Sequence, residues 1–287
     1  MMMSRKNKER VFFWIFRGCA AAVIAFLTII IMFVIVNGAG TISWDFLTQN
    51  PMPNDSGALV SGGILSPIIG TLMLMGLVLI IAIPIGVFGA VFLVEYCRPY
   101  KWSRYIWMTV NNLAGVPSIV WALLGVGIFV YYLAFGLSLI SAAITLSLMI
   151  LPIVMVSTKE ALEAIPSSIY DASIGLGATK WQTILHHILP YSASGIITGI
   201  ILSLSRAGGE TAPLLLTGVA INAAIPLSIF DQFQALPYYI YMMTSASDRA
   251  SAYPMAYGAA LVLIIIMMVM NLAAATLRSR YREKYKW

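Results

Sequence analysis

The chain alternates between long uncharged stretches and short charged segments. No Asp, Glu, Lys or Arg lies between Gly18 and Val36, within residues 56–94 or within residues 105–158. An α-helix needs about 20 predominantly apolar residues to cross the hydrocarbon core of a bilayer. These stretches therefore predict membrane-spanning helices, and the 105–158 stretch is long enough for two.

The pattern predicts six spans in an all-α, polytopic membrane protein. We place them at residues 14–36, 66–94, 107–131, 137–157, 192–219 and 255–277. The first is expected to be an uncleaved span, because a signal peptide has an apolar core of only about 7–15 residues. The predicted organisation is an amino-terminal tail (1–13), a membrane domain (14–277) that includes a long loop at 158–190, and a basic tail (278–287).

The composition supports a membrane protein. Hydrophobic residues make up 60% of the chain and charged residues only 10%, whereas soluble domains average roughly 45–50% and about 25%. These values exclude an ordinary soluble enzyme, a disordered chain and a fibrous protein.

The basic residues predict the orientation in the membrane. Fifteen of the 17 Lys and Arg lie at the two chain ends, in the loop from Arg98 to Arg104, or at Lys159 and Lys180. Arg249 is the one on the opposite side, and Arg206 lies within the fifth span. Basic residues accumulate in cytoplasmic loops, so both termini are expected to be cytoplasmic in a cell inner membrane. Because these residues do not gather on one helix face, no nucleic-acid partner is expected.

The sequence contains no motif for catalysis or for a bound cofactor. It has no G-x-x-x-x-G-K-[ST] phosphate loop, no His-Glu-x-x-His and no Cys-x-x-Cys. The only histidines, His186 and His187, are adjacent and would point about 100° apart on a helix, so they do not suit one metal ion. We expect a non-enzymatic chain that binds no metal or cofactor of its own.

The loop at 158–190 predicts two short amphipathic helices. Pro166 starts the first, and Gly175 and Gly177 end it. The second covers Ala178–Leu189. It is expected to place four apolar residues on one face and to stop at Pro190; the four are Trp181, Ile184, Leu185 and Ile188. Such a hairpin must dock on lipid, on the spans themselves or on another protein.

This loop resembles the coupling motif of bacterial ABC-importer permeases, E-A-A-x3-G-x9-I-x-L-P. Asp171-Ala172-Ser173 stands at its start, Gly177 at its glycine and Leu189-Pro190 at its end. Asp171 replaces Glu, Ser173 replaces Ala, and His187 replaces Ile. The resemblance implies a type I ABC-importer permease fold and a hairpin that sits in a groove of an ATPase subunit.

Further segments resemble the PstA-type permeases of bacterial phosphate ABC transporters. They include Ser43–Leu47, Leu93–Tyr96, Leu113–Val120 and Gly208–Leu215. The resemblance implies phosphate import as a heterodimer with a sister permease. It also implies two copies of an ATP-binding subunit, which would use the ATP, and an extracytoplasmic phosphate-binding protein.

Two charged residues lie within the fifth predicted span. At 100° per residue, Arg206 and Glu210 share a stripe with Gly195, Gly199, Pro213 and Thr217. A charge at the bilayer centre costs about 2.5–3.5 kcal/mol and usually faces a bundle interior or a pathway. Either the arginine binds phosphate in the translocation path, since its planar fork matches phosphate oxygens, or the two residues form a structural i, i+4 ion pair.

Three alternatives remain open from the residues. An ABC permease for another oxyanion, such as molybdate or sulfate, would use the same arginine chemistry. A self-sufficient secondary transporter or channel would need no docking hairpin. A membrane-embedded enzyme would need a cluster of titratable residues at one depth, and of the charged residues only Arg206 and Glu210 are expected inside the membrane, because Arg17 belongs to the basic amino-terminal end.

Overall fold

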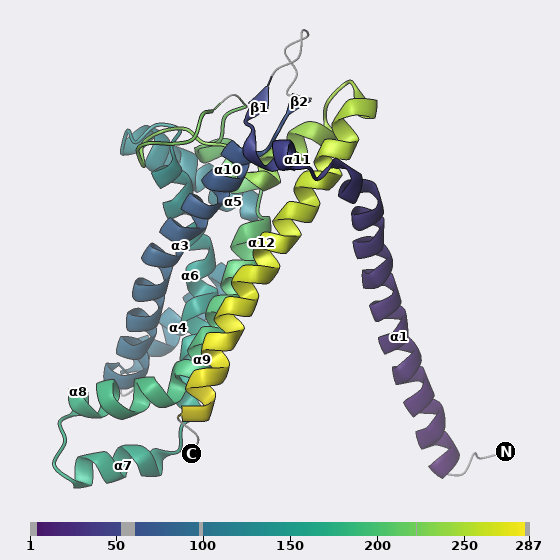
Figure 1. Cartoon of the computed structure of the whole chain (residues 1–287). Coiled ribbons are helices and arrows are strands. Elements are labelled where there is room, and N and C mark those ends of the chain that lie inside the picture. The colour runs from purple at the N-terminus through teal and green to yellow at the C-terminus, as the bar shows by residue number, and fades with distance from the viewer. Residues whose placement is uncertain (1–4, 53–60, 98–99, 222, 285–287) are drawn as a thin grey trace.

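The computed structural model describes residues 5–52, 61–97, 100–221 and 223–284, so Arg98 and Lys286 fall outside the described residues. This part of the chain is almost entirely helical (Figure 1). In order, its elements are α1 (Arg5–Gly38), η1 (Ala39–Thr41), α2 (Trp44–Thr48), β1 (Pro51–Met52), β2 (Ser61–Gly62), α3 (Leu65–Val91), η2 (Phe92–Tyr96), α4 (Lys101–Ala114), α5 (Ser118–Gly125), η3 (Val126–Tyr132), α6 (Leu139–Glu163), α7 (Ser167–Gly175), α8 (Lys180–Thr183), η4 (Ile184–Ile188), α9 (Leu189–Gly209), α10 (Ala212–Thr217), α11 (Leu236–Thr244) and α12 (Arg249–Lys284).

Five helices in the described residues are long and apolar enough to cross a membrane, and a bent pair supplies a sixth. The five are Glu9–Thr41, Leu65–Tyr96, Leu139–Glu163, Lys180–Gly209 and Arg249–Lys284. The predicted all-α polytopic fold is therefore confirmed. α1 already begins at Arg5 and α12 continues to Lys284, so the helices run well into both predicted tails.

The third predicted span, 107–131, is not one straight helix. α4 and the helix formed by α5 and η3 meet at an angle of 101°. Gly115 ends α4, and Pro117 precedes α5 in an extended conformation. Proline lacks an N–H and disfavours helical geometry in the residue before it, so the Gly115-Val116-Pro117 sequence breaks the span.

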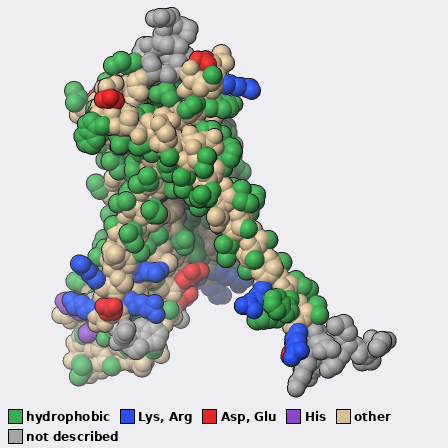
Figure 2. All heavy atoms as spheres, turned by 45° about the vertical axis from the view of Figure 1, so that its right-hand side comes forward, with side chains coloured by type: hydrophobic (Ala, Val, Ile, Leu, Met, Phe, Trp, Pro, Cys, Tyr) green, Lys and Arg blue, Asp and Glu red, His purple; other side chains and the backbone are tan. Residues whose placement is uncertain are grey.

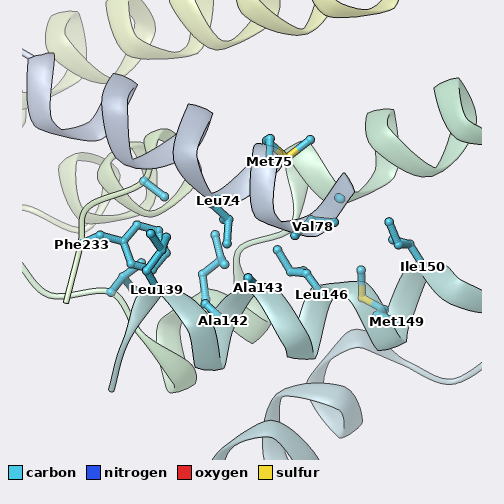
Figure 3. Close-up of a cluster of buried hydrophobic side chains, with 14 of the residues drawn as sticks. Leu74, Met75, Val78, Leu139, Ala142, Ala143, Leu146, Met149, Ile150 and Phe233 are labelled. Atoms are coloured by element: carbon cyan, nitrogen blue, oxygen red, sulfur yellow. The ribbon is translucent and has the colours of Figure 1, made fainter. Parts of the chain in front are cut away.

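The core lies between α3 and α6, which pack along each other at the centre of the bundle (Figure 3). Leu74 and Val78 of α3 meet Leu146 and Met149 of α6, and all four are at most 2% exposed. Phe233, from the segment that precedes α11, closes one end of this cluster and is fully buried. These contacts make α3 and α6 a rigid centre on which α9 also packs.

The end of the bundle opposite to α7 and α8 carries short elements that the hydropathy pattern did not predict (Figure 1). β1 and β2 form an antiparallel pair that aligns Pro51 with Gly62. α11 is joined to α3 because the backbone N–H of Leu236 donates a 2.8 Å hydrogen bond to Oγ1 of Thr71, in a buried position. These elements form a cap over this end.

α1 diverges from the rest of the bundle towards the amino terminus (Figure 1). The carboxyl end of α1 contacts α12. There, a Cβ added to Gly38 would lie only 2.6 Å from the carbonyl oxygen of Tyr257. None of the residues in the most apolar 18-residue stretch of α1 is buried within the chain. Lipid or another subunit must therefore cover this helix.

Charged side chains gather mainly at the end of the molecule that carries α7 and α8 (Figure 2). The long flank between the two ends is covered largely by hydrophobic side chains. A polar end, an apolar flank and a second polar end are what a protein that crosses a bilayer requires.

Candidate translocation site and coupling hairpin

The fifth predicted span, 192–219, is interrupted at its charged residues. α9 ends at Gly209, Glu210 has an extended backbone, and α10 starts at Ala212. Gly208 and Gly209 weaken the helix, and Pro213 cannot donate the hydrogen bond that would continue it. Pro213 and Thr217 therefore belong to α10 and do not extend the stripe on α9, which corrects the prediction from periodicity.

The structure brings Arg206 and Glu210 together at this break. Nε of Arg206 lies 3.6 Å from Oε1 of Glu210. The arginine side chain is 34% exposed and the glutamate side chain 19% exposed. Arg206 occupies the last turn of α9, where a cation complements the negative end of the helix dipole.

Contacts with α12 fix the depth of this pair. A Cβ on Gly208 would lie 2.4 Å from Sδ of Met267, and Ser205 exchanges hydrogen bonds with Asn271. Met267 is 11 residues before Arg278, the first charge at the carboxyl end of α12, which places it about 16 Å along the helix axis from that charge. Since the hydrocarbon core is about 30 Å thick, the pair lies near the middle of the membrane.

The ion pair sits at the edge of the buried face of α9. Towards the amino-terminal end of α9, two glycines let the helix approach α6 closely. A Cβ on Gly195 would lie 2.6 Å from Cβ of Ala161, and a Cβ on Gly199 would lie 2.3 Å from Cβ of Ser157. Leu202, one turn before Arg206, is 59% exposed. A half-exposed arginine at this depth is not stable against lipid, so this side of α9 must face a polar path or another subunit.

A second helix break lies between α4 and α5, and the hydropathy pattern missed it. α10 packs along α5, and a Cβ on Gly125 at the end of α5 would lie 2.9 Å from a methyl group of Thr217 at the end of α10. The two short helices therefore meet at their carboxyl ends. Gly115 and Pro117 were the sequence signal for this break.

The predicted helical hairpin is present. α7 runs over Ser167–Gly175, as Pro166 and the glycines predicted. Gly177 has a φ of +88°, a backbone conformation that residues with a side chain rarely adopt. Thr179 then caps α8 in a reciprocal pair of hydrogen bonds with Gln182.

Pro190 does not stop the second helix, contrary to the prediction. The helix continues from α8 through η4 into α9 as one stretch, Lys180–Gly209. η4 is a π-helical turn in which the Leu189 N–H donates to the carbonyl of Ile184. This wider turn directly precedes Pro190 and shifts the hydrogen-bond register where the proline has no N–H to give. The second arm of the hairpin and α9 are therefore one continuous helix.

The inner face of the hairpin is fixed to the spans. Ile184 and Ile188 are at most 4% exposed and pack among residues of α3, η2, α4 and α6. The hydroxyl groups of Ser173 and Thr183, 2.9 Å apart, join α7 to α8. Nζ of Lys180 donates a hydrogen bond to the Glu95 carbonyl.

The same region perturbs one titratable side chain. Burial raises the pKa of the Tyr170 phenol, and the carboxylate of Glu95 raises it further. Both effects disfavour the phenolate, so Tyr170 remains a neutral group at the base of the hairpin.

The outer face of the hairpin is apolar and exposed. It was expected to combine Trp181 and Leu185 with Ile184 and Ile188, and that prediction is wrong, because the two pairs point in different directions. The exposed fraction is 52% for Trp181, 44% for Leu185 and 91% for Leu176, whereas Ile184 and Ile188 are buried. The exposed apolar side chains of the hairpin are Ile174, Leu176, Trp181 and Leu185.

The remaining residues of the coupling motif occupy distinct positions. Asp171 and Ala172 are exposed on α7, Ser173 is buried between the two arms, and Leu189 and Pro190 are half-buried at the start of α9. Within the described residues, no group of three or more His, Cys, Asp or Glu side chains could hold a metal ion.

Comparison with known families decides the class of the protein. Residues 82–283, more than half of the chain, match the family described as binding-protein-dependent transport system inner membrane component. The chain belongs to this family. The chain is therefore a multi-pass permease of an inner-membrane transport system, which agrees with its membrane-spanning helices.

Two relatives of this permease and one solved structure support the assignment. It is 39% identical over 76% of its length to phosphate transport system permease protein PstA 1 of Mycobacterium tuberculosis, of which 71% is covered. It is 30% identical to the probable ABC transporter permease protein YqgI of Bacillus subtilis, over 98% of its own length and 99% of that protein. The predicted resemblance to PstA-type permeases is thus confirmed.

The fold matches that of a solved ABC transporter. A chain of the bacterial alginate ABC transporter, in complex with an alginate-bound periplasmic protein, superposes with a TM-score of 0.69 over 96% of both chains. The sequence identity is only 15%, so this likeness shows the fold alone. It confirms the predicted importer permease fold for this permease.

Proposed function

We propose that this permease is the membrane-spanning subunit of an ATP-driven importer of inorganic phosphate and forms part of the translocation path. The observation that carries the proposal is the Arg206–Glu210 pair at mid-membrane, exposed on one side of α9 in a chain similar to PstA permeases. The arginine supplies the charge-assisted, bidentate hydrogen bonds that a phosphate group accepts. Glu210 competes for the same guanidinium and prevents the anion from binding too tightly to leave.

ATP is hydrolysed by a partner, and this chain carries no reaction of its own. The exposed apolar face of the hairpin, formed by Ile174, Leu176, Trp181 and Leu185, is the docking surface for an ATP-binding subunit. Exposed apolar patches at the end of a membrane protein that faces water mark protein interfaces. Because the hairpin is continuous with α9, which bears Arg206, movement of the ATPase reaches the path through one helix.

The assembly contains a sister permease, two ATP-binding subunits and an extracytoplasmic phosphate-binding protein. The partly exposed ion pair supports the sister permease, which would cover it and complete the path. The extracytoplasmic protein would dock on the end formed by the β1–β2 pair and α11. Both termini are cytoplasmic, because the amino-terminal end of α1 and the carboxyl end of α12 lie at the level of the hairpin, where the basic residues gather (Figure 1, Figure 2).

Uptake of labelled phosphate tests this function. The chain is purified with its copurifying subunits, reconstituted into vesicles together with the binding protein, and supplied with ATP or with a non-hydrolysable analogue. We expect uptake only with ATP, and competition by unlabelled phosphate but not by molybdate or sulfate. Stronger competition by one of those oxyanions would assign another substrate, and uptake without ATP would identify a secondary transporter or channel.

A further inference from the structure

A cavity of about 1140 Å³ opens at the hairpin end of the bundle, between η2, α4 and α6. It is separate from the Arg206–Glu210 pair. Four charged side chains and the indole of Trp107 line it, together with Asn111 and Asn112 towards the α4–α5 break. The charged residues are Lys101, Arg104, Lys159 and Glu163.

The charges in this cavity favour an anion. Three cations face one carboxylate, and within the described residues none of Lys101, Arg104 and Lys159 forms an ion pair. A neighbouring cavity of about 950 Å³, under the hairpin, has the opposite balance. It is lined by Glu95, Glu163, Asp171 and Lys180. An anion at this end of the protein is therefore drawn to the first cavity and repelled from the second.

The sequence of α4 places the cations on one face. Ser103, Trp107 and Val110 form the buried face of α4, and Lys101 and Arg104 lie on the exposed side with Asn111 and Asn112. Nζ of Lys159, from α6, lies 4.8 Å from the centre of the Trp107 ring. This cation–π contact holds the ammonium group at the wall of the cavity.

The cavity also lies where phosphate groups are concentrated. Trp102 and Tyr105 on the same helix are 45% and 68% exposed, which is typical of the aromatic belt at a membrane–water interface. Basic pockets between spans on the cytoplasmic side bind anionic lipid headgroups. Inorganic phosphate that leaves the path carries the same chemical group.

We propose that Lys101, Arg104 and Lys159 form a phosphate-group binding site at the cytoplasmic end of α4. The group comes either from an acidic phospholipid of the inner leaflet or from free inorganic phosphate that leaves the permease. The second source rests on the proposed function, whereas the first does not. In either case Glu163 keeps the site reversible by lowering its net positive charge.

The test compares the Lys101→Gln/Arg104→Gln variant with the parent complex. An Arg280→Gln variant is the matched control, since Arg280 is also exposed at the same end but does not line the cavity. All three carry Arg206→Gln, so that phosphate bound at mid-membrane is not counted. One arm measures how much phosphatidylglycerol, relative to phosphatidylcholine, the detergent-solubilised complex binds after removal of copurified lipid. The other arm measures labelled inorganic phosphate by equilibrium dialysis.

A charge-assisted hydrogen bond contributes about 1.5–3 kcal/mol, so the double variant should weaken binding by at least about tenfold in one arm. Loss in the phosphatidylglycerol arm identifies a lipid site, and loss in the dialysis arm identifies a site for released phosphate. If the double variant assembles poorly, Lys159→Gln replaces it. Binding that is unchanged from the Arg280→Gln control in both arms overturns the inference. The proposed function would survive that result, because the uptake assay with Arg206 intact is independent of it.

Discussion

The Arg206–Glu210 pair allows a direct choice between a role in the path and a purely structural role. Three variants are compared: Arg206→Gln, Glu210→Gln and the double variant. Each substitution removes one charge and keeps a side chain that can form hydrogen bonds. Two unit charges 3.6 Å apart attract by about 5 kcal/mol at an effective dielectric constant of 20. Both side chains are partly exposed, so screening and desolvation reduce the net coupling to about 1–2 kcal/mol.

The two roles predict different patterns of transport and assembly. If Arg206 binds phosphate, its loss removes at least one charge-assisted hydrogen bond, and uptake should fall roughly ten- to a hundredfold while complex yield is kept. Removing a mid-membrane charge does not hinder insertion. Glu210→Gln should instead tighten phosphate binding and slow its release. In a structural pair, either single change strands a charge, and the double change restores both assembly and transport.

The assay combines ATP-dependent uptake with complex yield for all three variants. Arg278→Gln is the control, because Arg278 also contacts α9, through Oγ1 of Thr198 at 3.3 Å, but lies near the carboxyl end of α12 and away from the pair. A double variant that assembles well and transports at the parent rate would refute the path role of both residues.

Five further substitutions test the hairpin and the orientation. Gly177→Arg should leave the subunit in the membrane but uncouple it from the ATPase, because the φ of +88° at Gly177 disfavours any side chain. Gly175→Ala is the control, since a Cβ at Gly175 would meet open space and the backbone there is ordinary. Intact ATPase stimulation by the Gly177→Arg variant would contradict the docking role. Ile184→Ala should destabilise the hairpin by about 2–5 kcal/mol and speed proteolysis there. Leu185→Ala, on the exposed face, should instead lower ATPase copurification at unchanged stability. The orientation is tested in a background without Cys19 and Cys97. There, Ser247→Cys should react with an impermeant thiol reagent added from outside, and His186→Cys should not. Labelling of His186→Cys from outside would reverse the proposed topology.

Hydropathy was sufficient to predict the five long spanning helices, because crossing a bilayer requires a long apolar helix whatever its neighbours are. The coupling motif at Asp171–Pro190 likewise identified the hairpin, since the glycine at position 177 and its distance to Pro190 are local features of the chain. Local rules also placed α7, through Pro166 and Gly175.

Tertiary structure decided which faces are buried and where helices break. Periodicity grouped Trp181 with Ile184, but packing against α3, α4 and α6 buries only Ile184 and leaves Trp181 exposed. The helix continues through Pro190 because a π-helical turn precedes it, and no local sequence pattern predicted that turn. The breaks at Pro117 and Glu210 precede two helices, α5 and α10, that pack against each other. The sequence supplied the charges and the prolines, whereas contacts between segments far apart in the chain set the depth and exposure on which their proposed roles depend.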